Sequence, residues 1–340
     1  MDVWQPRSIL VTGGCGFIGS NFINYMFDKW PNTIFVVIDR LDDEGSEYNI
    51  QESIRNSPRY KLIKECLTRK QIITKTLFAF QVDTVVHFAA ITHVDQSYSD
   101  RFGTIIGNVA ATVNLLEAVT FEYKGVKRFV HISTDEVYGD SYLDATPKTE
   151  QSLLNPTNPY AASKGACELI IKSYWRSYKL PFLMVRMNNV YGPRQASSKL
   201  IPKFTLLAIE EKPYPLMGDG QHTRNWMFVD DCAEAIKRVT ETGRIGETYN
   251  IGTEFETTNY SVTEKIHNIV QKKMHRPKSK LLLEKIPDRP YHDRRYYMDC
   301  SKIKNEMKWS CKVPFEEGLQ KTIDYYIDQY QTQLDLRSHG

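Results

Sequence analysis

The sequence predicts a doubly wound α/β fold, in which helices cover both faces of a parallel sheet. Short apolar runs recur along the first half of the chain, and helical stretches separate them. After about residue 186, prolines and glycines break up the pattern and the elements become shorter. Alternating strands and helices are typical of parallel βαβ units. We therefore expect a first domain over residues 1–186, a smaller α/β substrate domain over 187–330 with some elements returning to the first, and a polar tail over 331–340.

Five apolar runs of four or five residues lack polar alternation, which predicts strands buried on both faces. These runs cover residues 8–12, 34–38, 84–88, 129–133 and 182–185. Apolar residues at helical spacing predict the helices. The helices are expected at residues 17–28, 104–123, 160–178, 199–210, 230–241, 262–272 and 315–330.

Composition excludes several classes of protein. The 340 residues include 44 Lys+Arg and 41 Asp+Glu, so the net charge is only +3. A nucleic-acid binder would need a clustered basic excess. No apolar run approaches the roughly 18 residues of a membrane span, and no signal peptide precedes the first run. The six cysteines are scattered without a CxxC pair, so we expect neither disulfides nor a metal site. The sequence therefore predicts a soluble cytoplasmic protein.

Glycines separate the first predicted strand from the first helix. Gly13, Gly16 and Gly19 give the spacing GxxGxxG, which lets the backbone approach a pyrophosphate at the positive end of the helix. Asp39 ends the second predicted strand, 20 residues after Gly19. A carboxylate there accepts hydrogen bonds from an adenosine ribose and repels a 2′-phosphate. The pattern predicts a Rossmann-type domain that binds NAD rather than NADP.

Tyr160 and Lys164 open a predicted helix after Asn158 and Pro159. A spacing of four places both side chains on one face, one turn apart. An ammonium near a phenol lowers the pKa of the phenol and makes it a usable base. The same spacing occurs by chance in many helices, but beside an NAD loop it predicts a base for hydride transfer.

Thr134, Asp135 and Glu136 follow directly after a predicted strand. Ligands of open α/β sheets gather at the carboxyl ends of strands, so these side chains are expected at the cofactor cleft. Two adjacent carboxylates can act as separate acid and base. The alternative is a helix N-cap with dipole-stabilised carboxylates, and position alone does not decide between the two.

Several motifs together give the chain a family resemblance. They are residues 12–19, His-Phe-Ala-Ala at 87–90, Ser-Thr-Asp-Glu-Val-Tyr-Gly at 133–139, Asn-Pro-Tyr-Ala-Ala-Ser-Lys at 158–164, Asn-Val-Tyr-Gly-Pro at 189–193, and further matches at 223–226, 249–252 and 288–296. The chain resembles an extended short-chain dehydrogenase/reductase acting on nucleotide sugars. The Thr-Asp-Glu triplet is similar to that of the nucleoside-diphosphate-glucose 4,6-dehydratases, in particular the dTDP-glucose group.

The resemblance implies a mechanism and a set of contacts. Tyr160, helped by Lys164 and Thr134, takes the C4 hydroxyl proton, Glu136 removes the C5 hydrogen, and Asp135 protonates the departing C6 hydroxyl. The implied NAD contacts are Gly13, Gly16, Phe17, Ile18, Gly19, Asp39, Cys66, Leu67, Ala89, Ala90, Asn108, Tyr160 and Lys164. The implied contacts of a dTDP-glucose or UDP-glucose substrate are His93, Thr134, Asn189, Lys199, Leu200, Arg224, Asn250, Arg289 and His292.

One departure concerns Cys66, which stands where the family usually has an adenine-contacting aspartate. The resemblance leaves two other functions open. A 4-epimerase or decarboxylase would share the chemistry of Tyr160 without losing water. A non-catalytic NAD-binding scaffold would usually lack one of the catalytic residues, all of which are present here.

Two predicted helices have broad apolar surfaces, at residues 104–123 and 160–178. Such surfaces exceed what packing on a sheet requires. We expect them to pair across a two-fold axis as a four-helix bundle, the usual dimer of the family. The alternative is that both helices are buried within one chain.

Overall fold

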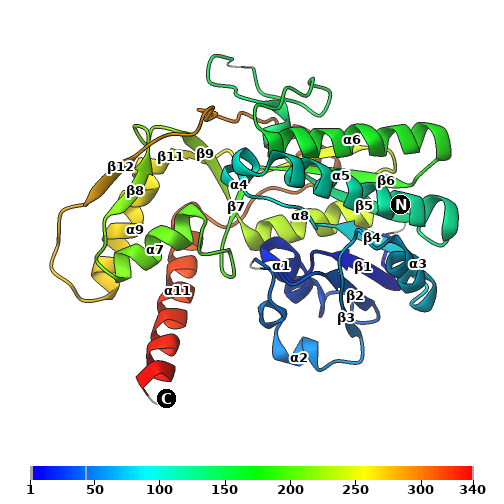
Figure 1. Cartoon of the computed structure of the whole chain (residues 1–340), viewed down its shortest axis with the longest axis horizontal. Helices are drawn as coiled ribbons and strands as arrows, with labels where there is room; N and C mark the ends of the chain where they lie inside the picture. The colour runs from blue at the N-terminus through cyan, green and yellow to red at the C-terminus, as the bar shows by residue number, and fades with distance from the viewer. Residues whose placement is uncertain (1–2, 43, 145, 339–340) are drawn as a thin grey trace.

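A computed structural model describes residues 3–42, 44–144 and 146–338. Seven parallel strands form the main sheet in the order β10-β6-β5-β4-β1-β2-β3. Helices cover both of its faces, and a second region built from two small sheets and three helices lies beside it (Figure 1). The chain runs outward in both directions from β1 and β4, which creates the crevice where open α/β sheets bind ligands.

The strands are β1 (Ser8–Thr12), β2 (Ile34–Asp39), β3 (Tyr60–Lys64), β4 (Thr84–His87), β5 (Arg128–Thr134), β6 (Phe182–Met187), β7 (Asn189–Tyr191), β8 (Tyr214–Met217), β9 (Thr223–Phe228), β10 (Thr248–Ile251), β11 (Glu256–Thr258) and β12 (Leu283–Ile286). The α-helices are α1 (Phe17–Met26), α2 (Glu52–Arg55), α3 (Lys70–Ala79), α4 (Val94–Ser99), α5 (Arg101–Glu117), α6 (Pro159–Tyr178), α7 (Leu200–Ile209), α8 (Val229–Thr242), α9 (Asn259–Lys273), α10 (Ser301–Met307) and α11 (Phe315–Ser338). Short 3₁₀ turns cover Glu47–Asn49 and Asp135–Tyr138, and a π-helical turn, Ala118–Glu122, extends α5.

Successive side chains of each strand point to opposite faces of the sheet and contribute to two separate cores. On β1, Val11 belongs to the core under α1 and α8, whereas Leu10 belongs to the core under α3, α5 and α6. Both side chains are fully buried, which explains why these strands lack polar alternation. The two-sided burial fixes the register of the sheet, because a slip by one residue would exchange the two faces.

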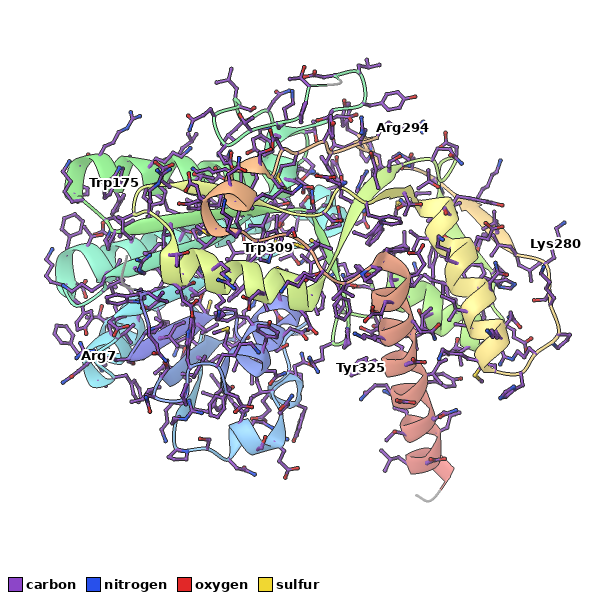
Figure 2. The ribbon with its side chains drawn as sticks, turned by 180° about the vertical axis from the view of Figure 1, so that it is seen from behind. Arg7, Trp175, Lys280, Arg294, Trp309 and Tyr325 are labelled. Atoms are coloured by element: carbon purple, nitrogen blue, oxygen red, sulfur yellow. The ribbon has the colours of Figure 1, made fainter. Side chains whose placement is uncertain are left out.

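The second region has its own core between α7, α9 and α11 and its small sheets, which have the strand orders β11-β9-β7 and β12-β8. Seen from behind, α11 descends away from the sheets and carries Tyr325 (Figure 2). The chain returns to the first region twice, first over α8 and β10, which pack on α1 and pair with β6, and again at α10, which packs on α8 and β10. The boundary at residue 186 stays a prediction.

All five predicted strands and all seven predicted helices are present, with ends shifted by a few residues. The predicted tail is helical as far as residue 338, because α11 continues through it. The expectation that no segment reaches membrane-span length is wrong for Arg101–Glu122, which is long and apolar enough by length and composition. That segment packs along α6, with part of its surface buried in the core under α5 and α6.

A candidate active site at the carboxyl ends of the strands

Three adjoining pockets form one cleft along the carboxyl edge of the main sheet. Their volumes are about 790, 1100 and 1210 Å³. Gly13 and Ala90 line both the first and the second pocket, whereas Glu136 and Lys199 line both the second and the third. The three pockets therefore share walls from the loop after β2 to the second region.

The glycine loop shapes the middle of this cleft. Gly13 has a φ of +68°, and a Cβ there would come within 2.7 Å of the Ala89 backbone. A Cβ on Gly19 would come within 2.3 Å of the Gly13 carbonyl oxygen. Gly16 differs, because its nearest neighbour would be the Gly13 oxygen at 3.4 Å and its surface faces the second pocket. The protein leaves room beside Gly16, at the N-terminus of α1, where a pyrophosphate fits.

We predict that two alanine substitutions in this loop have different effects. Gly16→Ala should leave the melting temperature of the NAD-stripped protein nearly unchanged and lower the amount of NAD that copurifies, because its methyl group enters the ligand's space. Gly19→Ala should lower the melting temperature itself, because its methyl group collides with backbone. Calorimetry and cofactor extraction measure both quantities. Equal NAD content in Gly16→Ala and the unmodified protein would contradict this assignment.

The first pocket is lined by six residues predicted to contact NAD, namely Asp39, Cys66, Leu67, Ala89, Ala90 and Asn108. Asp39 is buried at the end of β2, and its carboxylate accepts hydrogen bonds from the Cys15 and Leu41 amides at 2.9 Å each. Burial raises the pKa of Asp39, and these two bonds oppose that rise. Cys66 lines the pocket beside Glu65, so the usual aspartate position is occupied by a thiol with an acid next to it.

Strand β5 brings the acidic pair to the second pocket. Thr134 is its last residue, and Asp135 and Glu136 begin the following 3₁₀ turn. The Asn188 amide donates to Asp135 at 3.2 Å, and the Asn158 amide donates to Glu136 at 3.1 Å. The Thr134 hydroxyl accepts from the Glu136 amide at 3.3 Å, so the predicted N-cap is also present. One turn therefore contains both predicted features, the helix N-cap and the adjacent pair of carboxyl groups.

The two carboxyl groups differ in their surroundings. Asp135 is 3% exposed, and burial, followed by the charge of Glu136, raises its pKa to about 7. Burial also raises the pKa of Glu136, while the hydrogen bond from Asn158 and the charge of Arg224 lower it. A carboxyl that titrates near neutrality can donate a proton, and a neighbouring carboxylate can accept one when it is ionised. The pair therefore has the properties of a general acid and a general base.

Tyr160 and Lys164 also line the second pocket, on the first turn and a half of α6. Asn158 caps this helix by accepting from the Ala161 amide at 2.8 Å. The expectation of a lowered tyrosine pKa is wrong for the free protein, because burial and then the charges of Glu136 and Asp135 raise the pKa of Tyr160. Burial lowers the pKa of Lys164. Tyr160 is thus a protonated phenol until further positive charge enters the pocket.

The third pocket collects most of the predicted substrate residues. It is lined by His93, Asn189, Lys199, Leu200, Arg224, Arg289 and His292. Asn250 does not line it, because that side chain is fully buried and bonds to Tyr138 and to the carbonyls of Lys148 and Asp299. Asn259, the first residue of α9, lines the pocket instead. Sequence analysis missed Asn259, although it follows two threonines just before a predicted helix.

The third pocket is rich in positive charge. Arg224 donates to the Thr223 and Asp293 carbonyls at 2.8 and 2.9 Å, which leaves its charge without a bonded carboxylate among the described residues. Arg289 pairs with Asp95 at 2.6 Å. His93, expected near the sugar, is paired with Glu44. Guanidinium groups that converge on one pocket can bind a diphosphate.

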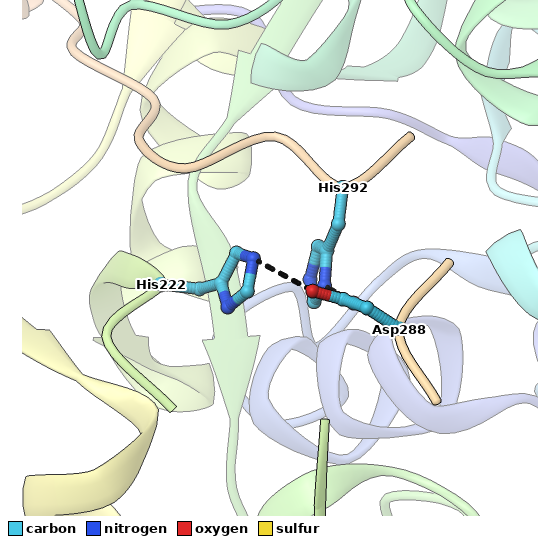
Figure 3. A group of neighbouring side chains, drawn as sticks. All are labelled: His222, Asp288 and His292. Carbon is cyan, nitrogen blue, oxygen red and sulfur yellow. Dashed lines mark hydrogen bonds and ion pairs between the residues drawn. The ribbon is translucent and has the colours of Figure 1, made fainter. Parts of the chain in front are cut away.

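His222, Asp288 and His292 form a cluster beside this pocket (Figure 3). The Asp288 carboxylate lies 2.6 Å from His292 Nδ1 and 3.5 Å from His222 Nε2. The two imidazole rings are stacked, with centroids 3.6 Å apart and planes at 17°. Nearly parallel rings do not aim their in-plane lone pairs at one point, so a single metal ion would require one ring to turn. The absence of a metal stays a prediction.

The fold and the cleft are those of an extended short-chain dehydrogenase/reductase. The family model described as GDP-mannose 4,6 dehydratase matches residues 10–322, and the chain belongs to this family.

Individual relatives agree with this placement. The chain is 38% identical over 332 residues to the dTDP-glucose 4,6-dehydratase of Haemophilus influenzae, covering 94% of this chain and 98% of the relative. It is 39% identical over 324 residues, 95% of this chain, to the Arabidopsis thaliana trifunctional UDP-glucose 4,6-dehydratase/UDP-4-keto-6-deoxy-D-glucose 3,5-epimerase/UDP-4-keto-L-rhamnose-reductase, and it spans 47% of that protein's length. The Streptomyces venezuelae dTDP-glucose 4,6-dehydratase structure with NAD and TYD bound has a TM-score of 0.87 and 36% identity, covering 95% and 98% of the two chains.

Proposed function

We propose that the protein is a hydro-lyase that converts UDP-glucose or dTDP-glucose to the corresponding 4-keto-6-deoxyglucose nucleotide. The observation that carries this proposal is the Asp135–Glu136 pair in one pocket with Tyr160 and Lys164. A 4-epimerase needs the tyrosine but has no step that uses an acid beside a base. Loss of water from C5 and C6 uses both. The names of the relatives support the same reaction.

NAD fits the first two pockets as a resident cofactor. Gly13, Gly16 and Gly19 would cradle its pyrophosphate, and Asp39 would meet the adenosine ribose. When bound, NAD accepts the C4 hydride and later returns it to C6. The protein must therefore hold the cofactor through the whole cycle, and the adjoining pockets for the two ligands support this requirement.

Different residues of the second pocket carry out the successive proton transfers. Tyr160 takes the proton of the C4 hydroxyl, with Thr134 oriented beside it and Lys164 supplying positive charge. The resulting ketone acidifies the C5 hydrogen, which Glu136 removes, and a proton is added back at C5 when the hydride returns to C6. Asp135, whose pKa of about 7 keeps much of it protonated, gives its proton to the departing C6 hydroxyl. Lys199, Arg224 and Arg289 hold the diphosphate in the third pocket.

The direct test is mass analysis of the products after the purified protein is incubated with each nucleotide sugar separately, without added NAD. We expect loss of one water from at least one of the two, and the faster substrate identifies the preferred base. Unchanged masses with both sugars, even after NAD is supplied, would overturn the proposed reaction. A product of unchanged mass but altered retention would indicate a 4-epimerase.

We further propose that the protein is a cytoplasmic homodimer that pairs through α5 and α6. These helices lie side by side in the layer that covers one face of the sheet. Each exposes a large apolar side chain, Phe102 on α5 with 78% of its surface accessible and Leu169 on α6 with 61%. Two such helix pairs would bury this surface as a four-helix bundle. Light scattering at micromolar concentration should give twice the chain mass, and Leu169→Lys should give the single-chain mass. A monomer before substitution would contradict the dimer.

A further inference from the structure

Three polar residues stand side by side at the carboxyl edge of the main sheet, beneath the cleft. Thr12 on β1 is in register with His87 on β4, and His87 is in register with His131 on β5. In a parallel sheet such partners point to the same face, here the face covered by α5 and α6. All three are buried, with at most 1% of their surface exposed. A row of buried polar groups under a catalytic helix requires a reason.

The hydrogen bonds of His87 determine which of its nitrogens carries the proton. Thr112 on α5 donates its hydroxyl hydrogen to the Asn108 carbonyl at 2.9 Å or to Cys167 Sγ at 3.2 Å, so its oxygen accepts from His87 Nε2 at 3.2 Å. His87 Nδ1 then accepts from the Thr12 hydroxyl at 2.7 Å. Burial, followed by the charge of Lys164, lowers the pKa of His87 to about 3. His87 is therefore neutral, with both nitrogens occupied.

His131 has a different set of neighbours. Its Nε2 lies 3.5 Å from Lys164 Nζ, and its Nδ1 has no hydrogen-bond partner among the described residues. Lys164 is itself 3% exposed, and within residues 3–42, 44–144 and 146–338 its Nζ has no other hydrogen-bond acceptor. An ammonium can only donate, so His131 Nε2 is the acceptor and the ring proton lies on Nδ1.

The charged and titratable groups around this pair do not change that assignment. Burial, then Lys164 and His87, lower the pKa of His131 well below its ordinary value. On α6, Cys167 and Glu168 are the other titratable neighbours of Lys164. The Glu168 carboxylate is held by Arg186, with the closest donor–acceptor pairs at 2.5 to 3.1 Å, so it is neutralised elsewhere. The imidazole is a neutral acceptor for a buried cation.

We propose that His131 is a positioning residue that holds the ammonium of Lys164 in place for Tyr160. A carboxylate at this position would orient Lys164 but would also cancel the positive charge that a Tyr160 phenolate needs. A neutral imidazole orients the ammonium and leaves its charge intact. His87, fixed between Thr12 and Thr112, packs against His131 with ring centroids 5.3 Å apart and limits its movement. The proposal rests on the proposed function, because it assigns Lys164 a role there.

Two matched substitutions test which atom of His131 matters. Glutamine places its amide oxygen near the position of Nε2, whereas asparagine reaches only the position of Nδ1. We expect His131→Gln to keep kcat within about 10-fold and His131→Asn to lose about 10²-fold, with little change in KM for either. In His131→Asn the phenolate is less stabilised, so the pH at which activity rises should move upward. Equal losses and unshifted pH profiles in both variants would overturn the proposal, since a structural role alone predicts them.

A second measurement does not depend on turnover. Nitrogen-15 NMR of histidine-labelled protein without substrate should find His131 protonated on Nδ1 and His87 protonated on Nε2, with both rings neutral from about pH 5 to 8. A proton on Nε2 of His131 would overturn the proposal. If the protein did not dehydrate either sugar, the proposed reaction would fail, yet the NMR result would still show whether His131 accepts from Lys164.

Discussion

Replacing Asp135 with asparagine should slow the loss of water by about 10²- to 10⁴-fold, the range expected when a general acid is removed. Oxidation at C4 should survive, because Tyr160 and Lys164 are untouched. The variant should therefore show the near-ultraviolet absorbance of reduced nicotinamide after substrate is added, without release of product. Asn188, which donates to Asp135 at 3.2 Å, can donate equally to the new amide oxygen. Water loss at an undiminished rate would remove Asp135 from the role of acid.

The same substitution should stabilise the folded protein, and the effect should depend on pH. Folding raises the pKa of Asp135 from its ordinary 3.8 to about 7, so the folded state disfavours the ionised carboxylate. The resulting cost is absent below about pH 4, grows as the pH rises, and is complete above about pH 7. Asp135→Asn should thus gain little near pH 4 and at most about 4 kcal/mol above pH 7. Denaturant unfolding at both pH values measures the difference. A gain that is independent of pH would contradict the raised pKa.

Replacing Tyr160 with phenylalanine should abolish oxidation at C4 and with it every later step, with a loss of about 10³-fold or more. In contrast to Asp135→Asn, no reduced nicotinamide should form when substrate is added. Because burial and two carboxylates raise the pKa of Tyr160, activity of the unmodified protein should rise with pH until the phenol ionises in the loaded site. That rise should be missing from the residual activity of the variant.

Tyr138→Phe supplies the matched control for this tyrosine. Tyr138 is buried at the end of the 3₁₀ turn that begins with Asp135, but its hydroxyl bonds to Asn250 and Arg186 and it does not line the cleft. We expect a loss of stability with the chemistry retained. Reduced nicotinamide forming in Tyr160→Phe as fast as in Tyr138→Phe would show that Tyr160 is not the base.

The parts of the fold that could be predicted are those with a single local cause. Buried parallel strands are uniformly apolar, so β1, β2, β4, β5 and β6 were visible in the sequence. Strand β3 lies at the edge of the sheet, and its lysines give it a mixed pattern without a clear period. Strand β10 is only four residues long and joins the sheet after a long excursion through the second region. Its place depends on tertiary packing rather than on local pattern.

The same distinction between local pattern and tertiary packing applies to the residues of the site. Motif spacing predicted the glycines, the acid pair and the Tyr160–Lys164 face, because each lies within one turn or one helix. Asn250 and Asn259 could not be ranked, since only the fold decides which asparagine reaches the third pocket. The pKa of Tyr160 went the opposite way from the prediction because burial in the folded protein, and then the charges of the acid pair 24 and 25 residues earlier in the chain, raise it. The role of His131 could not be predicted from the sequence for a similar reason, because its partner Lys164 lies on another element.

In the proposed reaction, water loss and hydride return occur in one site with a retained cofactor. The most direct measurement follows a deuterium label at C4 of the better of the two nucleotide sugars, with unlabelled NAD in solution. We expect a product lighter by one water that carries the deuterium at C6. Deuterium in the free NAD pool, or a product of unchanged mass with the label still at C4, would contradict the account.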